Sequence, residues 1–334
     1  IKNGYAMTIE IKTSTMKPIR NTYAHIERRF GDKPATRYQE ATYDVHSTHN
    51  FHYKPLWDQD REINDPARTA VVMGDWYDLK DPRQFYYGPY VQNRSKMQET
   101  AEGNFKFFEK RGLGDSIDSS LREKIIQLVI PMRHAEVAAN LNNMYGTAHG
   151  TGTAVTQALI FEAMDRFGNA QYFSKIGLAL DGNTGDSLAT AKEHWMSNPA
   201  WQGVRAYCEK TLTIKDWFEA FIAQAIVLDT LINDLYYRQF DEWLTQNNGR
   251  DLLLLMEFMQ DRAKDSQRWS DSVLKTVVTE SEHNTNQVLA WISTWRIRAQ
   301  EALEPLAGAL LSDKALADAF AVLEKRLTKV GLNC

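Results

Sequence analysis

The chain has 334 residues, of which 43% are hydrophobic and 25% are charged. This length allows two average domains or one large helical domain, and the composition excludes a disordered or collagen-like chain. The 39 lysines and arginines against 43 aspartates and glutamates give a formal charge of −4, without a basic stripe, so nucleic-acid binding is not expected. No apolar run approaches the roughly 20 residues that cross a bilayer. We expect a cytoplasmic protein without membrane contact.

The two ends of the chain add little to this picture. Residues 1–6 precede Met7, whose following Thr-Ile-Glu resembles an ordinary start, and we assign no function to them. The two cysteines, Cys208 and Cys334, do not form a disulfide framework, which fits a reducing compartment.

Residues 1–95 are unusual in composition. They contain six of the nine prolines and nine of the fourteen tyrosines. Proline removes a backbone donor and favours extended conformations before it, so long helices are not expected here, while the aromatic side chains argue against disorder. We therefore expect an ordered but irregular N-terminal arm over residues 1–95, whose aromatic rings are buried against the helical body or against another chain.

This arm supplies the candidates for contact with a partner subunit. Aromatic and arginine side chains dominate protein interfaces, and the segment between Pro82 and Pro89 is expected to be stiff and extended. The interface candidates are Trp57, Trp76, Arg83, Tyr86, Tyr87 and Tyr90. The alternative, in which the rings of the extended segment fold back onto helices of the same chain, stays open.

From residue 96 to residue 334 the pattern is helical. Apolar residues recur at 3.6-residue spacing from Leu121 to Met132 and from Trp217 to Leu235, which predicts long amphipathic helices. Pro131 is expected to kink the first of these helices or to start a new turn. Clusters of turn-forming residues predict breaks between helices at 146–152, 182–185, 198–199 and 247–249. The expected fold is all-α, a bundle of long helices with short connections.

A bundle of long helices makes a carboxylate-bridged di-iron centre with two Glu-x-x-His pairs the first metal site to consider. The sequence contains one such pair, Glu280-x-x-His283, for which a role at a helix start or cap is the simpler interpretation. The run His46, His49 and His52 lies in the proline- and aromatic-rich arm, where packing or backbone hydrogen bonding is favoured over metal binding. We find no self-sufficient active site.

The chain as a whole resembles a known family. An arm ending in Asp81-Pro-Arg-Gln-Phe-Tyr-Tyr-Gly-Pro-Tyr-Val-Gln-Asn is followed by long helices that carry Arg133-His-Ala-Glu136 and Asn169-Ala-Gln171. From Met7 onward the chain is similar to the β subunits of bacterial multicomponent monooxygenase hydroxylases, in particular those of the phenol hydroxylase branch. The resemblance implies a ferritin-like helical domain over residues 96–334, preceded by the extended, irregular arm over residues 1–95.

In that family the α subunit holds the di-iron centre, and the resemblance implies that this chain has lost it. Glu136 resembles the lone glutamate ligand of the first half. Arg166 and Asn169 stand where the Glu and His of the first pair would ligate. In the second half Asp234 resembles the next lone carboxylate. The positions of the second pair are occupied by Arg262 and Asp265.

A cation at a ligand position excludes a pair of metal cations, so neither a catalytic residue nor a metal ligand is expected in this chain. Arg166 and Arg262 are instead expected to form buried ion pairs that replace metal charge with guanidinium charge. Their expected partners are the nearby acids Glu136, Asp165, Asp234 and Asp261.

The resemblance implies a structural β subunit that supports a di-iron α subunit. The assembled hydroxylase is expected to be a dimer of αβγ units that converts phenol or methylphenols to catechols with dioxygen. Electrons are expected from an NADH-dependent reductase, and a small regulatory protein is expected as a further partner. Two alternatives are an autonomous ferritin-like metal enzyme and a helical interaction module without enzymatic context.

Overall fold

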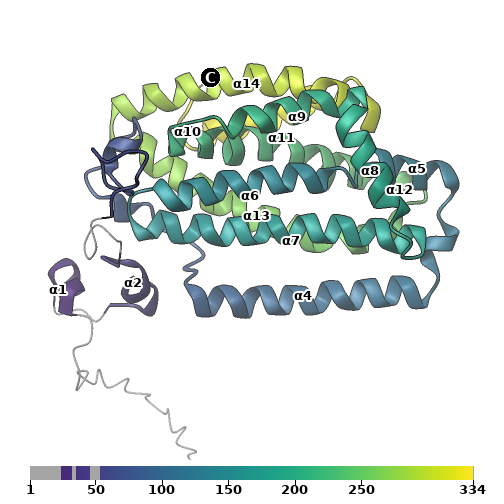
Figure 1. Cartoon of the computed structure of the whole chain (residues 1–334), viewed down its shortest axis with the longest axis horizontal. Coiled ribbons are helices and arrows are strands. Elements are labelled where there is room, and N and C mark those ends of the chain that lie inside the picture. Colours follow the sequence, from purple (N-terminus) through teal and green to yellow (C-terminus); the bar gives the residue numbers. More distant parts are fainter. Residues whose placement is uncertain (1–23, 32–34, 46–52, 334) are drawn as a thin grey trace, which may run out of the picture.

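The computed structural model describes residues 24–31, 35–45 and 53–333. Within these ranges the chain is helical and has no strand, which confirms the all-α expectation. Long helices lie side by side in one bundle (Figure 1). They are α4 (Tyr87–Lys110), α5 (Ser119–Leu128), α6 (Met132–His149), α7 (Thr153–Asp181), α9 (Pro199–Thr211), α13 (Arg250–Glu280), α14 (Glu282–Leu310) and α15 (Ala315–Lys329). Helix α8 (Asp186–Ser197) runs across one end of the bundle.

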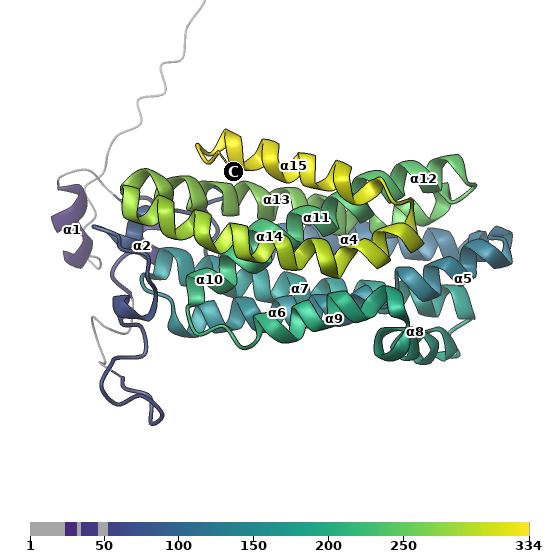
Figure 2. The same cartoon turned by 90° about the horizontal axis from the view of Figure 1, so that it is seen from above.

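Shorter elements precede and connect these helices. The first two helices lie at one end of the bundle, and α15 lies along the side formed by α13 and α14 (Figure 2). The short elements are α1 (Ala24–Phe30), α2 (Arg37–Thr42) and the 3₁₀ turns η1 (Pro66–Arg68), η2 (Trp76–Asp78) and η3 (Leu113–Ser116). The histidine run at 46, 49 and 52 and the cysteine at 334 lie outside the described residues.

The expected breaks between helices are confirmed. Gly152 has a φ of +84° immediately before α7, and Gly182 has a φ of +68° immediately after it, a backbone region that only glycine adopts without strain. Asn198 caps α9 by accepting a hydrogen bond from an amide of its first turn, and proline occupies the first position of that helix. Pro131 starts a new helix, because α5 ends at Leu128 and Pro131 is the N-cap of α6.

The segment from Trp217 to Gln246 is one continuous helical path, and the apolar spacing predicted its first part, up to Leu235. Two stretches of this path are π-helical rather than α-helical. In π-helical hydrogen bonding each turn holds one extra residue. The path consists of α10 (Trp217–Phe221), the π segment η4 (Ile222–Leu228), α11 (Asp229–Asp234), the π segment η5 (Leu235–Gln239) and α12 (Phe240–Gln246).

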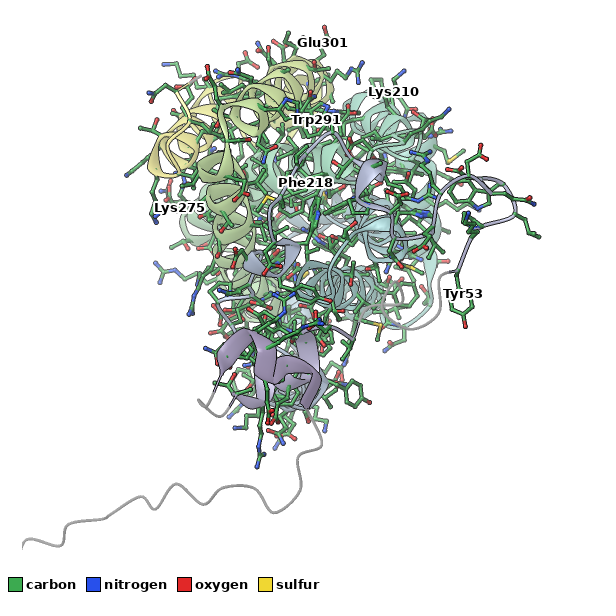
Figure 3. All side chains as sticks on the ribbon, turned by 90° about the vertical axis from the view of Figure 1, so that its left-hand side faces the viewer. Tyr53, Lys210, Phe218, Lys275, Trp291 and Glu301 are labelled. Atoms are coloured by element: carbon green, nitrogen blue, oxygen red, sulfur yellow. The ribbon has the colours of Figure 1, made fainter. Side chains whose placement is uncertain are left out.

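The core of the bundle is rich in large aromatic side chains. Phe218 and Trp291 lie inside it with ring centroids 6.4 Å apart, whereas Lys210, Lys275 and Glu301 lie at the periphery (Figure 3). The tryptophans at positions 201, 217, 269 and 295 are fully buried. Each large ring removes a large apolar area from water, so these positions hold the helices together.

The long helices begin earlier in the chain than the composition predicted. The expectation of a stiff, extended segment between Pro82 and Pro89 is wrong, because α4 already begins at Tyr87. Pro89 lies in the first turn of α4, where the backbone amide lacks an intrahelical partner in any case, so proline is tolerated there. The boundary expected at residue 95 therefore falls inside α4.

The arm segment formed by residues 70–74 is held by the junction between α13 and α14. The side chain of Asn284, which is fully buried, accepts from the Val72 amide at 2.9 Å and donates to the Val72 carbonyl at 2.8 Å. Glu280 accepts from another amide of the segment at 2.8 Å, and His283 Nε2 lies 2.9 Å from one of its carbonyl oxygens. The Glu280-x-x-His283 pair thus anchors backbone at a helix junction.

None of the described helices combines the length and the apolar character needed to cross a bilayer.

Replacing Asn284 with alanine is expected to release this part of the arm. Both backbone groups of Val72 would lose their partner at a partly buried place, so the free energy of unfolding should fall by about 1–2 kcal/mol. Urea denaturation measures the loss, and limited proteolysis should show new cleavage within residues 70–74. Asn247→Ala, an exposed asparagine after α12, is the matched control and should change stability by no more than about 0.5 kcal/mol. Equal effects of the two variants would contradict this role.

Candidate functional site

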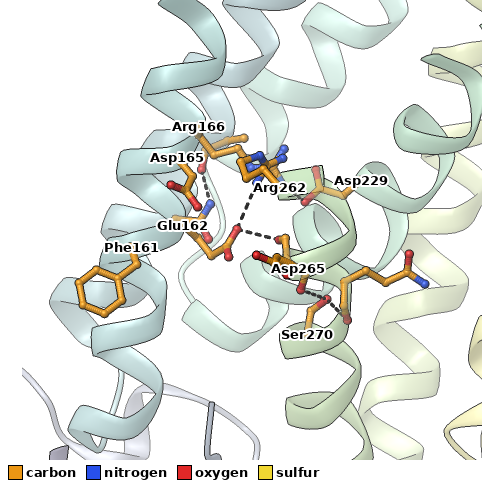
Figure 4. Close-up of polar contacts among 12 residues, drawn as sticks. Phe161, Glu162, Asp165, Arg166, Asp229, Arg262, Asp265 and Ser270 are labelled. Atoms are coloured by element: carbon orange, nitrogen blue, oxygen red, sulfur yellow. Dashed lines mark hydrogen bonds and ion pairs between the residues drawn. The ribbon is translucent and has the colours of Figure 1, made fainter. Parts of the chain in front are cut away.

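A polar stripe runs along the otherwise apolar helix α7. Glu162, Asp165, Arg166 and Asn169 are spaced at i, i+3, i+4 and i+7, which places them on one face of the helix. All four are at most 4% exposed. Figure 4 shows Glu162 and Arg166 of α7 on the side of the helix that faces Arg262 of α13 and Asp229 of α11. A buried polar cluster in the middle of a bundle is costly unless its charges are paired, so its partners decide what it can do.

Arg166 occupies the centre of the cluster. Its Nη1 lies 3.4 Å from Glu136 of α6, and its Nη2 donates to Asp229 of α11. Burial would lower the pKa of Arg166, but Asp229, Glu136 and Glu162 together raise it above its ordinary value. The guanidinium group is therefore permanently charged and neutralises two carboxylates from different helices, which confirms the expected pair with Glu136.

Glu162 is the second centre of charge, and the sequence analysis missed it. One of its oxygens accepts from Arg83 of the arm at 2.7 Å, and the other accepts from Ser266 at 2.7 Å and lies 3.3 Å from Nη1 of Arg262. Burial alone would raise the pKa of Glu162, but the guanidinium groups of Arg83, Arg262 and Arg166 outweigh it and lower that pKa to about 2. The carboxylate is thus ionised at any physiological pH.

Asp165 forms a third group with α4. Arg94 donates to both of its oxygens, at 2.6 Å for Nη2, and the Tyr90 hydroxyl donates to Oδ1 at 2.9 Å. The Tyr90 ring is stacked on Phe161 with centroids 4.2 Å apart. Burial raises the pKa of Asp165, with Arg94 opposing it. The pair attaches α4 to α7 at the edge of the cluster.

The π segments determine which acids enter the cluster. In η4 the side chain of Gln224 donates to Asp229 at 2.8 Å, and in η5 that of Gln239 donates to Asp234 at 2.8 Å. Each pair is five residues apart, the spacing that a π turn brings onto one face. The same winding turns Asp229 toward Arg166.

The expectation that Asp234 is an ion-pair partner of Arg166 or Arg262 is wrong. Asp234 pairs with Arg238 and Gln239 of its own helical segment, and Asp229 is the acid that meets Arg166. Asp261 is also outside the cluster, because it faces solvent beside Lys264.

Asn169 and Asp265, the other two residues expected at degenerate ligand positions, differ in environment. Asn169 is completely buried, and within the described ranges neither its amide oxygen nor its nitrogen has a hydrogen-bond partner. Asp265 is about one third exposed and lies 3.3 Å from Arg94 at the rim of the cluster.

The residues present do not fit a pair of metal ions. Each carboxylate of the cluster already accepts from a guanidinium group. The polar atoms of Arg166 and Arg262 that lack partners are N–H donors, namely Nε of the first and Nε and Nη2 of the second. Two inward-facing guanidinium groups repel a cation electrostatically. Among the described residues no group of three or more histidine, cysteine, aspartate or glutamate side chains is arranged to hold a metal.

The interface candidates fall into two classes. Trp76 and Tyr90 are at most 9% exposed, and the side chain of Arg83 is 3% exposed, so these three are occupied within the chain itself. This corrects the expectation that they face a partner, in favour of the alternative in which the rings fold back onto their own helices. Trp57 and Tyr87 remain 66% and 76% exposed. The sixth candidate, the tyrosine at position 86, is half-buried at the N-cap of α4.

Removing the charge of Glu162 tests the cluster. Glu162→Gln leaves Arg262 without its carboxylate partner in a fully buried place, so the free energy of unfolding at pH 7 should fall by about 3–5 kcal/mol. Because the pKa of Glu162 is lowered from 4.5 to about 2, its ionic contribution is complete above pH 4.5 and is lost as the pH falls toward 2. In urea denaturation, the difference in the free energy of unfolding between the variant and the parent protein should therefore become smaller below pH 4.5.

The matched control is Glu102→Gln, which breaks a partly exposed ion pair between Glu102 of α4 and Lys175 of α7. Exposed pairs of this kind contribute about 0–1 kcal/mol. A Glu162→Gln variant as stable as this control at pH 7 would rule out the buried pair as a structural element.

Comparison with known proteins assigns this chain to a family. Residues 57–281 match the model of the methane, phenol and alkene hydroxylases. The chain is 51% identical over 327 residues to the phenol 2-monooxygenase oxygenase component MhpL of Acinetobacter pittii, with 98% of each chain covered. It is 24% identical over 250 residues to the β subunit of the toluene-4-monooxygenase hydroxylase component of Ectopseudomonas mendocina, covering 73% of this chain and 75% of the relative.

A solved structure agrees with these relationships. The fold matches the crystal structure of phenol hydroxylase from Pseudomonas sp. OX1 with a TM-score of 0.92 and 46% identity, over 97% of this chain and 99% of that one. The described helices and the sequence relatives thus point to the same group of proteins. This chain belongs to the methane, phenol and alkene hydroxylase family and is related along nearly its whole length to the oxygenase components of phenol 2-monooxygenases.

Proposed function

We propose that this chain is the non-catalytic β subunit of a multicomponent phenol hydroxylase. In this proposal it supports an α subunit that holds the di-iron centre and hydroxylates phenol or methylphenols to catechols. The complete hydroxylase is a dimer of αβγ units, which receives electrons from an NADH-dependent reductase and is controlled by a regulatory protein. The name of the toluene-4-monooxygenase relative, a β subunit of a hydroxylase component, supports this assignment.

The cluster around Arg166 supports a chain that is not itself catalytic. A di-iron centre supplies oxygen activation, and it needs several carboxylates with free lone pairs turned toward the metal. Here the acids around the cluster form ion pairs with arginines, and the guanidinium groups of Arg166 and Arg262 lie between these acids. The cluster therefore supports a structural role.

One observation carries the scaffolding role, namely the outward face of the α6–α7 hairpin. Between residues 137 and 148 α6 has no charged residue, and its exposed positions are Val137, Leu141, Met144 and Ala148. The exposed positions of α7 are Met164, Phe167 and Gln171, none of which is charged. A helix that faces water normally has a polar outer face, and one that is apolar all round is normally buried.

We call the surface made by these exposed positions of the two helices the α6–α7 face; its Met164 and Gln171 lie at the edge that borders α4. The two helices lie side by side toward the viewer in Figure 1, and α8 crosses one end of the hairpin. Asn140 of α6 donates to the Ala163 carbonyl of α7 at 2.7 Å, which joins the two helices at the middle of the face. Exposed contiguous apolar surfaces of this kind mark interaction sites. We assign this face to the contact with the α subunit.

The loop that carries Trp57 is a second contact surface in this proposal. It projects from the bundle, as the position of Tyr53 shows (Figure 3). Asp58 is paired with both Arg61 and Arg68, and the Arg68 guanidinium lies 5.1 Å from the centre of the Trp57 ring, so the loop is held in shape. The edge of the indole meets His149 at the end of α6, which makes the loop continuous with the α6–α7 hairpin.

The first test is the metal content of the chain. Expressed alone, the chain should hold no stoichiometric iron and hydroxylate no phenol, because its carboxylates are bound to guanidinium groups. Iron analysis and absorption spectroscopy of the purified chain, with the co-expressed α partner as the positive control, provide the measurement. About two tightly bound irons per chain, with the spectrum of a bridged pair, would reject the proposal.

The second test concerns the α6–α7 face. Leu141→Asp should weaken assembly with the α subunit about 100-fold, because it buries an unpaired carboxylate at the interface. The isolated variant should melt like the parent, since Leu141 is 45% exposed in the free chain. Co-purification and sedimentation with the α partner measure the effect.

The control is Ile297→Asp, which changes an apolar residue of α14 that is 59% exposed away from the hairpin. It should assemble normally. Trp57→Ala tests the projecting loop in the same assay and is expected to weaken assembly by about 30-fold, as for a central interface tryptophan. If Leu141→Asp and Ile297→Asp behaved alike, the α6–α7 face would not be the contact surface.

A further inference from the structure

Helix α4 is attached to the bundle along a narrow seam, which leaves room beside it. Five of its 24 residues are buried, and they form a single row from Tyr90 to Phe108. Next to this row α4, α7 and α13 enclose a half-open cavity of about 310 Å³. Small-molecule sites in proteins start at about this size, so the cavity is large enough for a single-ring compound.

The charged groups at the two ends of the cavity are already paired. At one end Arg94 holds Asp165 at 2.6 Å, and at the other Lys175 holds Glu102 at 2.6 Å. An anionic or cationic ligand would have to break one of these pairs to gain a counter-charge. The cavity therefore favours an uncharged ligand.

The wall between these ion pairs is aromatic. The rings of Tyr172 and Phe258 lie against each other with centroids 4.7 Å apart, and both line the cavity. Gly168 of α7 also lines it, and a side-chain carbon added at this glycine would meet no atom within 4 Å. A flat ring can thus lie along α7 against the aromatic wall.

Two amide groups complete the lining. The side chains of Gln98 on α4 and Gln171 on α7 both border the cavity, and within the described ranges neither makes a hydrogen bond to the protein. A carboxamide offers one acceptor and two donors. A hydroxyl group on the ligand could therefore donate to, or accept from, either of these amides.

We propose that this cavity binds a neutral, single-ring phenol, with the ring against Tyr172 and Phe258 and the hydroxyl group between Gln98 and Gln171. The site needs no residue of another subunit, and no bond of the ligand is made or broken there. The inference does not depend on the proposed role of the chain, because it can be measured on the chain alone. A bound phenol would bridge α4 and α7 and so stabilise the attachment of α4.

The experiment is a titration of the purified full chain with phenol, followed by calorimetry and by the melting temperature. Phenol should bind in one equivalent and raise the melting temperature. Cyclohexanol, which lacks the aromatic ring, and toluene, which lacks the hydroxyl group, should each bind about fivefold more weakly. Equal binding of phenol and cyclohexanol, or no binding of phenol, would overturn the proposal.

Two glycine variants locate the site. Gly168→Leu places a branched side chain in the cavity from a position where a Cβ meets no atom within 4 Å, and it should abolish phenol binding. Gly103→Leu, at an equally open glycine of α4 that does not line the cavity, should leave phenol binding unchanged. Both substitutions favour helix formation, and unchanged melting of the free variants checks the fold. Gln171→Leu should weaken the binding of phenol about fivefold and leave the binding of toluene unchanged. Phenol binding that survives Gly168→Leu would reject this location.

Discussion

A buried carboxylate needs a cation, and this requirement organises the whole molecule. Arg166 neutralises acids from α6 and α11, Arg262 brings α13 to Glu162, and Arg94 ties α4 to Asp165. Even the arm is fixed in this way, because Arg83 reaches Glu162 from outside the bundle. Such pairs contribute little compared with apolar packing of the same volume, but removal of one partner is expensive. The network therefore specifies which segments meet.

The helices and their ends follow from local chemistry and could be predicted. Apolar spacing identifies the long segments, and glycine, asparagine and proline mark their limits, as at Gly182 and at Asn198. The start of α4 was missed because the density of prolines suggested an extended segment, although a proline in the first helical turn costs no hydrogen bond. The π segments leave no signal in apolar spacing, since the core positions of a fully buried helix are apolar in any register.

The candidate site was only partly predictable, because some of its contacts depend on the π segments or join residues far apart in the sequence. Arg166 and Glu136 were paired correctly, because both lie on regular helices. Asp234 was named as a partner by resemblance, whereas Asp229, which lies between the two π segments, is the acid that pairs with Arg166. Glu162 could have been found, since it lies one helical turn before Arg166 on the same stripe, but its partner Arg83 is 79 residues away and no local pattern joins them.

The uncharged outer face of α6 and α7 also bears on how the protein must be produced in a cell. A chain that leaves the ribosome with such a surface tends to associate with copies of itself, because nothing on the face repels an identical face. Synthesis in equal amounts with a partner, and early encounter with it, would keep that surface covered. An excess of this chain over its partner would be removed by aggregation or proteolysis, so the dosage of the two chains is constrained by the two apolar rows of a single helical hairpin.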